Sequence, residues 1–184
     1  MKTYIFANCK KNEFNTYSKN LQDKVPKDAR LVILNRGAVY YKVPMFKEYK
    51  NQVLMMRKCM VNGISGFFGL ETLADDGVHV PLFQEIIGVD PGDTTILTIG
   101  HKDKTSEIKK IATPWVTEYN KITGKEVTTG YAAYYLVQDL YGEKPEDIYL
   151  VNFYGNNDKS TGKWYGHAWD YEDKWLKDKQ RIYC

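Results

Sequence analysis

The sequence predicts an α/β fold with a mostly parallel sheet, because short strand-like runs alternate with helix-like runs along the chain. The strand-like runs are apolar and rich in β-branched or aromatic residues, as in the buried strands of parallel sheets. They cover residues 3–7, 30–34, 94–99 and 148–151, with a short closing strand at 181–183. With 184 residues, the chain is long enough to bury a core, and we expect one domain over residues 1–184.

Helix-like runs fill several intervals between these strands. The clearest covers residues 128–141, where apolar residues recur at helical spacing and Gly142 supplies a stop signal. A second helix is expected over 170–179, because this segment begins acidic and ends basic and so suits the helix dipole. Weaker helices are expected at 12–24, 81–87 and 104–112.

Four stretches give a weaker signal. Residues 52–60 are compatible with a third strand or with a helix, and residues 43–51 favour neither. The glycine- and phenylalanine-rich run at 63–69 is predicted to be a loop. The polar run at 117–125 is predicted to be a loop or the tail of a helix.

The composition is that of an ordinary globular chain. Hydrophobic residues make up 43% and charged residues 27%, and the formal net charge is +3. This charge is too small, and the Lys and Arg residues are too scattered, to indicate a nucleic-acid partner. No segment approaches the roughly 20 apolar residues that span a bilayer, so we expect no membrane span. The first apolar run is also too short for a signal peptide.

The cysteines indicate a compartment. Cys9, Cys59 and Cys184 form no CxxC pair and no even-numbered framework, so a reducing cytoplasm is the simplest interpretation. The His and Cys spacing matches no zinc signature. Fifteen tyrosines and four tryptophans serve mainly as packing, and they also suit stacking on bases or sugars.

A candidate anion site opens the helix expected at 128–141. Thr128, Thr129 and Gly130 offer two hydroxyls and a small turn, and the N–H groups of a helix start favour a negative charge. The same threonines can act as a plain N-cap, and the two roles are compatible. Tyr154 follows the next strand, at the sheet edge where α/β folds bind ligands, so its phenol can donate to a phosphate. Packing at that edge is the alternative.

Asparagines follow the first two predicted strands. Asn8 and Asn35 would lie at the carboxyl edge of a parallel sheet, where an amide can bind a phosphate, a ribose or a base. The alternative is turn chemistry, since Asn bonds readily to its own backbone.

One histidine lies in a polar, aromatic loop near the end of the chain. His167 follows Tyr165, a weaker candidate phosphate donor, and precedes Glu172 by five residues. Histidine is the side chain most easily poised to take up a proton near pH 7. The alternative is that His167 only packs between Trp164 and Trp169.

In their order and spacing, these elements resemble the motifs of the sialyltransferases, both the animal family and related bacterial enzymes. The ends of the first two strands resemble the long motif, and the segment that runs from the helix start through the next strand resembles the short motif. His167 and Glu172 match the His, four residues, Glu spacing of the very short motif. The matching runs are Phe6-Ala7-Asn8, Ile33-Leu34-Asn35-Arg36, Val127-Thr128-Thr129-Gly130 and Tyr154-Gly155.

The resemblance covers residues 3–37 and 127–175, and the sequence departs from the family pattern within two of the motifs. Cys9-Lys10-Lys11 stands where the family has small residues, which changes the nucleotide contact expected there. Val127 stands where the short motif has proline.

The resemblance implies a single Rossmann-like domain, a variant of the GT-A glycosyltransferase fold. It implies an enzyme that transfers sialic acid, or a related acidic sugar, from a CMP-sugar donor to a hydroxyl of a glycan or other acceptor, by inverting single displacement. His167 would be the general base and Glu172 would support its loop. No metal or other cofactor is implied, and the chain has no Asp-x-Asp triplet for a divalent ion. The nucleotide and its phosphate would be held by Asn8, Asn35, Thr128, Thr129, Gly130, Tyr154 and Tyr165.

Two other functions are compatible with these residues. One is a nucleotide-binding module without catalysis, descended from such an enzyme, which the short chain and the altered first loop favour. The other is a CMP-sugar hydrolase that uses His167. Oligomerisation is left open by the sequence.

Overall fold

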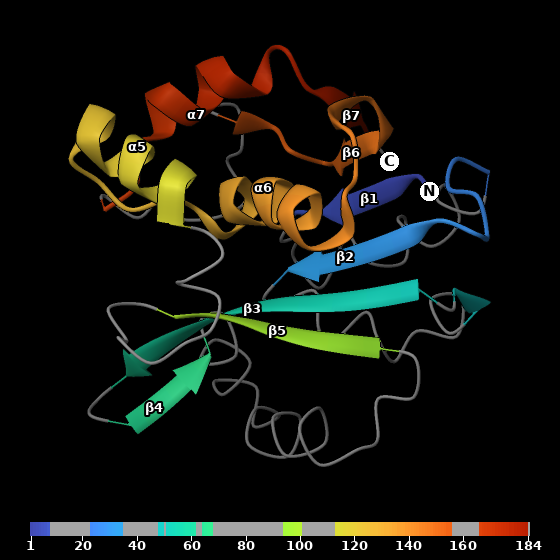
Figure 1. Ribbon diagram of the computed structural model, residues 1–184, viewed down its shortest axis with the longest axis horizontal. Helices are drawn as coiled ribbons and strands as arrows, with labels where there is room; N and C mark the ends of the chain where they lie inside the picture. The colour runs from blue at the N-terminus through green and yellow to red at the C-terminus, as the bar shows by residue number, and fades with distance from the viewer. Residues whose placement is uncertain are drawn as a thin grey trace.

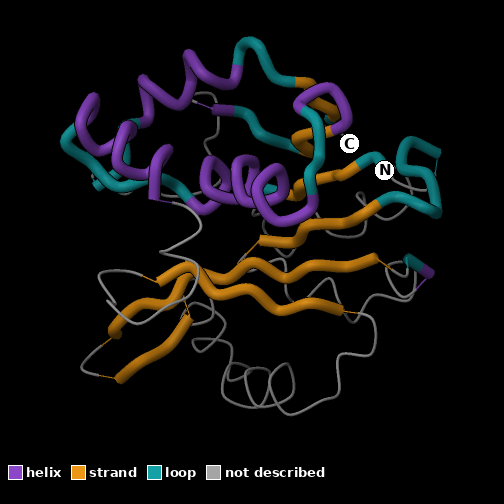
Figure 2. The backbone as a smooth tube through the Cα atoms, viewed as in Figure 1, coloured by secondary structure: helices purple, strands orange, loops and turns teal. Residues whose placement is uncertain are grey.

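A seven-stranded sheet dominates the computed structural model, which describes residues 1–7, 23–34, 48–49, 51–61, 64–67, 94–100, 113–155 and 166–183 (Figures 1 and 2). The strand order is β4-β3-β2-β1-β6-β7, with β5 also paired to β3. Every strand pairing is parallel except that of β3 with β4. The strands are β1 (Thr3–Phe6), β2 (Arg30–Leu34), β3 (Asn51–Val61), β4 (Ile64–Phe67), β5 (Thr94–Gly100), β6 (Ile148–Val151) and β7 (Gln180–Ile182). The predicted α/β fold with a mostly parallel sheet is confirmed.

Most of the predicted strands are present, and one loop prediction is wrong. The undecided stretch at 52–60 is a strand, because it lies within β3. The run at 63–69 was expected to be a loop, but β4 lies inside it and pairs antiparallel with the end of β3. Asn62-Gly63 separates the two strands in the sequence, and an Asn-Gly pair between apolar runs is a strong hairpin signal. The glycine content of the run concealed that signal.

Three α-helices are described: α5 (Thr113–Thr123), α6 (Thr129–Tyr141) and α7 (Trp169–Leu176). A short 3₁₀ turn, η4 (Pro145–Asp147), follows α6. The loop or helix tail predicted at 117–125 is helical over most of its length. Pro114 occupies the first turn of α5, where its missing N–H leaves no hydrogen bond unmade. The predicted helices at 12–24, 81–87 and 104–112, and the ambiguous residues 43–47, lie outside the described residues.

Helix α6 begins and ends where its sequence signals predict. The Thr128 side chain accepts a hydrogen bond from the Tyr131 N–H and so caps the helix start. Gly142 has a left-handed φ of 64° and its N–H bonds to the Gln138 carbonyl, which ends the helix. Helix α7 ends at Leu176, three residues before the predicted limit.

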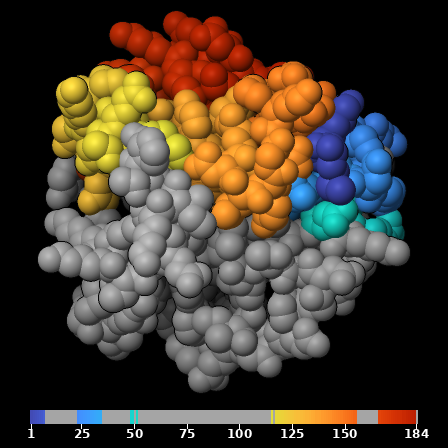
Figure 3. Space-filling model, viewed as in Figure 1, coloured from blue at the N-terminus to red at the C-terminus, as the bar shows by residue number. Residues whose placement is uncertain are grey.

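The core lies between α6 and the central strands. Helix α6 contacts β1, β2 and β3, and Figure 1 shows α5 and α7 beside it. In the space-filling view these three helical segments adjoin one another at the surface in yellow, orange and red (Figure 3). All four residues of β1 are buried, which fits a central strand covered on both faces. The buried contacts under α6 include Ile5, Val32, Leu34, Ala133, Leu136, Val137 and Leu150.

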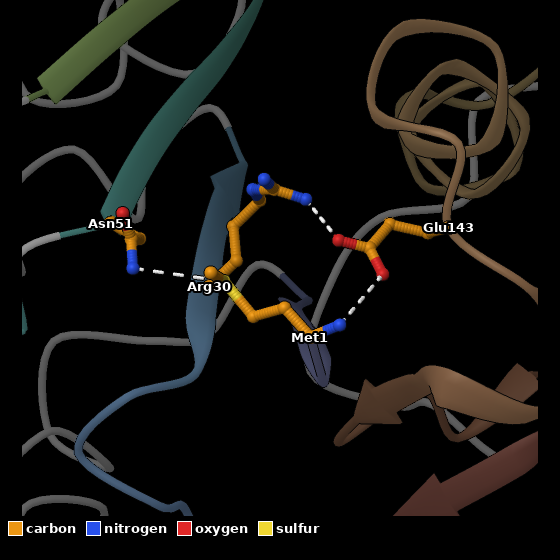
Figure 4. Close-up of polar contacts among 4 residues, drawn as sticks. All are labelled: Met1, Arg30, Asn51 and Glu143. Atoms are coloured by element: carbon orange, nitrogen blue, oxygen red, sulfur yellow. Dashed lines mark hydrogen bonds and ion pairs between the residues drawn. The ribbon is translucent and has the colours of Figure 1, made fainter.

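Charged groups meet at the amino edge of the sheet, where β1, β2 and β3 begin (Figure 4). The Glu143 carboxylate pairs with the Arg30 guanidinium and lies 3.8 Å from the Met1 ammonium group. Only 6% of the Glu143 side chain and 16% of the Arg30 side chain are exposed. The guanidinium also lies 3.9 Å from the centre of the Tyr141 ring. This ion pair ties the start of β2 to the end of α6.

Replacing Arg30 by Met should therefore lower the free energy of unfolding by about 3 kcal/mol, because Glu143 stays buried without its main partner. The double variant Arg30→Met, Glu143→Leu should recover most of this loss, since no buried charge is left unpaired. Urea denaturation measures both effects. Lys27→Met is the control: its pair with Glu48 has side chains 51% and 57% exposed, so little change is expected. Equal losses for Arg30→Met and Lys27→Met would contradict a special role for the buried pair.

Within the described part of the chain, no helix is long and apolar enough to cross a membrane.

Candidate functional site

The start of α6 and the loop after β6 lie together at the carboxyl edge of the sheet. The chain reverses between α6 and β6, so the start of the helix faces the end of the strand. A Cβ added to Gly130 would lie 2.4 Å from Cε1 of Phe153, the second residue after β6. At the same edge, the Ala7 N–H donates to the Val151 carbonyl at 3.0 Å, so β1 and β6 end side by side. The structure thus brings Gly130 against Phe153, in the loop that also carries Tyr154.

His167 lies beside the segment that leads into α6. The Glu126 N–H donates to the Gly166 carbonyl at 3.0 Å, and Glu126 and His167 form a parallel bridge. Nδ1 of His167 lies 2.8 Å from the Glu126 carbonyl. A carbonyl oxygen only accepts, so Nδ1 carries the proton and the lone pair of the neutral ring is on Nε2. The ring also meets Trp169 edge-on, with centroids 5.5 Å apart. A general base needs a lone pair such as the one on Nε2 of His167.

Glu172 connects all three helices. Its Oε1 accepts hydrogen bonds from the Tyr119 hydroxyl of α5 at 2.7 Å and from the Thr128 N–H at 3.0 Å. Its Oε2 accepts from the Thr128 hydroxyl at 2.5 Å. The residue is buried, so these donors replace the water that its carboxylate loses. The carboxylate also lies at the start of α6, where the helix dipole favours negative charge.

Thr128 therefore has the N-cap role that the sequence allowed. Its hydroxyl oxygen accepts a hydrogen bond from the Tyr131 N–H at 3.1 Å, and its O–H donates one to Oε2 of Glu172. Both its N–H and its hydroxyl are engaged inside the protein. Thr129 and Gly130 are buried in the first turn that follows.

The loop after β6 has a constrained backbone. Asn152 is 4% exposed and has a φ of 58°, in the left-handed region, and its N–H donates to the Ile182 carbonyl at 2.8 Å. Gly155 has a φ of 62°, and a Cβ there would lie 2.2 Å from Oδ1 of Asp173. The Asn152 bond holds this loop against β7, and at Gly155 the backbone passes close to α7. Asn152 was missed by sequence reasoning, although it follows β6 as Asn8 follows β1 and Asn35 follows β2.

Two exposed tyrosines stand at this edge. Tyr154 is 41% exposed and Tyr183 is 43% exposed, and their ring centroids lie 5.1 Å apart. The Tyr154 hydroxyl donates to Oδ1 of Asn152 over a long 3.3 Å. The Arg181 guanidinium lies 5.8 Å from the Tyr183 ring centre. Exposed aromatic faces of this kind can stack on a base or on the apolar face of a sugar.

Aromatic side chains fill the space between α5, α6 and α7. The Tyr119 ring packs edge-on against Tyr131 at 4.9 Å and Tyr171 at 5.2 Å. Burial, and next the nearby Glu172 carboxylate, raise the pKa of Tyr119 well above the usual phenol range. Burial also raises the pKa of Tyr134 to about 12. Tyr119 is therefore a neutral phenol, and its O–H donates a hydrogen bond to Glu172.

Asn8, Asn35 and Tyr165 lie outside the described residues, so their place in the site stays a prediction. The residues just before the two asparagines, Ala7 and Leu34, are at the carboxyl ends of β1 and β2. Among the residues that the structure describes, no three His, Cys, Asp or Glu side chains gather closely enough to bind a metal ion.

Comparison of the chain with protein-family models, with curated proteins and with solved structures gave no match. The likeness to sialyltransferases therefore rests on the sequence motifs.

The contact between Gly130 and Phe153 can be tested by substitution. Gly130→Ala should lower the free energy of unfolding by about 1–3 kcal/mol, because the new methyl group overlaps the Phe153 ring. Without that overlap, alanine in a helix is favoured over glycine by about 1 kcal/mol. In a Phe153→Leu background, the same substitution should therefore be neutral or stabilising. Urea denaturation of the four proteins in this cycle measures the coupling, and stabilisation by Gly130→Ala alone would rule out the close contact.

Proposed function

We propose that this chain is a sialyltransferase-like glycosyltransferase with a Rossmann-like domain related to the GT-A fold. It would transfer sialic acid, or a related acidic sugar, from a CMP-sugar to an acceptor hydroxyl by inverting single displacement. One observation carries the proposal. The start of α6 adjoins the loop after β6 through Gly130 and Phe153, and the segment that leads into α6 holds a histidine whose neutral ring has its lone pair on Nε2.

The strand order supports a ligand at this edge. From β1 the chain moves outward through β2, β3 and β5, and then returns to the other side of β1 for β6 and β7. Open α/β sheets bind ligands at the carboxyl ends of the strands where the order reverses in this way. Here the reversal lies between β1 and β6, next to Gly130 and Asn152.

The nucleotide would lie across this reversal. Asn8 and Asn35 are proposed to bind the nucleotide, together with the first turn of α6. Since Thr128 is engaged by Glu172, the helix contribution is assigned to the backbone of Thr129 and Gly130. Asn152 is added to the set because it directly follows β6 at the same edge.

Tyr154 and Tyr165 are proposed to donate to the leaving phosphate. The hydrogen bond from Tyr154 to Asn152 is long, so its hydroxyl can turn to a better acceptor. Negative charge grows on the phosphate as the glycosidic bond breaks, and donors placed there stabilise the transition state.

His167 is proposed as the general base. Its Nε2 takes the proton of the acceptor hydroxyl while the oxygen attacks the anomeric carbon. CMP leaves with the electrons of the broken bond, and the configuration inverts. The Nδ1–H bond to Glu126 orients the ring and stabilises the imidazolium that forms. We propose that the reaction uses no metal cofactor, because the sequence has no Asp-x-Asp triplet. The cysteine pattern leads us to propose a cytoplasmic location.

CMP should bind the native chain and raise its melting temperature. Saturation to 100 times Kd stabilises a native protein by about 2.7 kcal/mol, which is a shift of several degrees for a chain of this size. Differential scanning fluorimetry with millimolar CMP measures it, and AMP is the control. No shift with CMP, or an equal shift with AMP, would contradict a cytidine nucleotide site.

His167→Ala should keep CMP affinity and lose transfer, because a positioned general base contributes about 10²–10⁴-fold to rate. The wild-type rate should fall as the pH is lowered through the range where imidazole gains its second proton, since imidazolium cannot accept one. Product analysis with donor and a panel of acceptors, beside CMP calorimetry on the same variant, measures both properties. His79→Ala is the control, because His79 lies outside the motifs.

Three outcomes would contradict this assignment. Wild-type turnover in His167→Ala would remove its role as base. Free sugar released at the same rate with and without acceptor would indicate a hydrolase. CMP binding without any turnover would indicate a binding module.

A further inference from the structure

We propose that Tyr119 is a positioning residue for His167, acting through a hydrogen bond to the residue that follows the histidine. The link to catalysis rests on the function proposed above, whereas the structural role of Tyr119 can be measured without any activity.

The Tyr119 hydroxyl has two partners in the site. It accepts a hydrogen bond from the Ala168 N–H at 3.2 Å and donates one to Oε1 of Glu172 at 2.7 Å. The residue is fully buried, so water does not compete for either bond. Ala168 directly follows His167 in the chain, and the hydroxyl therefore reaches the histidine loop from α5.

These bonds extend a short ladder between two segments. Residues 126–128 and 166–168 run parallel, and the Glu126 N–H bonds to the Gly166 carbonyl. One step further along, the N–H groups of Thr128 and Ala168 bond to side chains. The first donates to Glu172 and the second to the Tyr119 hydroxyl. Since Tyr119 and Glu172 are themselves bonded, they join the two segments where the backbone ladder stops.

His167 lies between these two fixed points. Its Nδ1–H bond to the Glu126 carbonyl, which sets the tautomer, needs the two segments in register. Without the Tyr119 hydroxyl, the Ala168 N–H loses its buried side-chain acceptor, and the loop is held less firmly on the side opposite Gly166. We therefore expect loss of the hydroxyl to loosen the His167–Glu126 bond.

Tyr119→Phe separates this role from simple packing. It keeps the ring that packs against Tyr131 and Tyr171 and removes only the hydroxyl. Tyr134→Phe is the matched control, because Tyr134 is a buried tyrosine of the same core cluster whose hydroxyl bonds neither Ala168 nor Glu172.

The first readout is ¹⁵N NMR of the imidazole rings, with the His167 signals assigned by their absence in His167→Asn. In the wild type, we expect the Nδ1–H tautomer with slow proton exchange. Tyr119→Phe should give a mixture of tautomers and exchange at least about 10-fold faster, whereas Tyr134→Phe should match the wild type. An unchanged His167 signal in folded Tyr119→Phe would overturn the proposal.

Hydrogen exchange of the wild-type Ala168 amide gives a second test that needs no variant. A bond to a buried hydroxyl predicts strong protection, and exchange at the rate of an open loop would overturn the proposal even if Tyr119→Phe fails to fold.

The third readout is transfer. Because small misplacements of a catalytic group cost up to about 100-fold in rate, kcat should fall by about 10-fold to 100-fold in Tyr119→Phe. KM for the donor and CMP affinity should stay near wild type. If the wild type transfers nothing while the NMR and exchange results hold, the proposed function fails and the positioning role stands. If the wild type transfers and Tyr119→Phe has wild-type kcat, the positioning role fails.

Discussion

The described site depends on one buried carboxylate, that of Glu172. Burying a charge is costly unless hydrogen bonds replace its hydration, and here the Tyr119 hydroxyl and both the N–H and the hydroxyl of Thr128 do so. These donors come from two parts of the fold: Tyr119 from α5 and Thr128 from the start of α6. The bonds therefore determine where α6 begins and how α7 packs on it. The same bonds also position the His167 loop, which leads into α7.

This arrangement also limits what the helix end can bind. A helix N-terminus favours an anion, but at α6 the protein supplies one of its own in Glu172. A second anion beside it would be repelled, so the proposed phosphate belongs further along the first turn, toward Gly130 and the loop after β6. That is the side where the constrained Asn152 and the exposed Tyr154 lie. The helix end then acts as a support for the site, and only part of it is available to ligand.

Local signals predicted much of the fold and only part of the site. Helix α6 was predictable because Thr128, its apolar face and Gly142 are all encoded within one short segment. Helix α5 was not, because its sequence is polar and its helical state depends on packing by residues such as Tyr119. The bonds of Glu172 join residues 44 and 53 positions apart, and no periodicity in the sequence reports such pairs. Asn152 and the β4 hairpin are different, since the sequence held usable signals for both.

The two edges of the sheet carry different kinds of interaction. At the amino edge, the pair of Arg30 with Glu143 is buried, complementary in charge and joined to the strands that it stabilises. At the carboxyl edge, Asn152 takes the left-handed region, which is unfavourable for a residue with a side chain, and Gly155 occupies a position that has no room for one. Such conformations persist only where the surrounding structure over-determines them. The parallel strands β1, β2 and β6 join the two edges, because each begins at the amino edge and ends at the carboxyl edge.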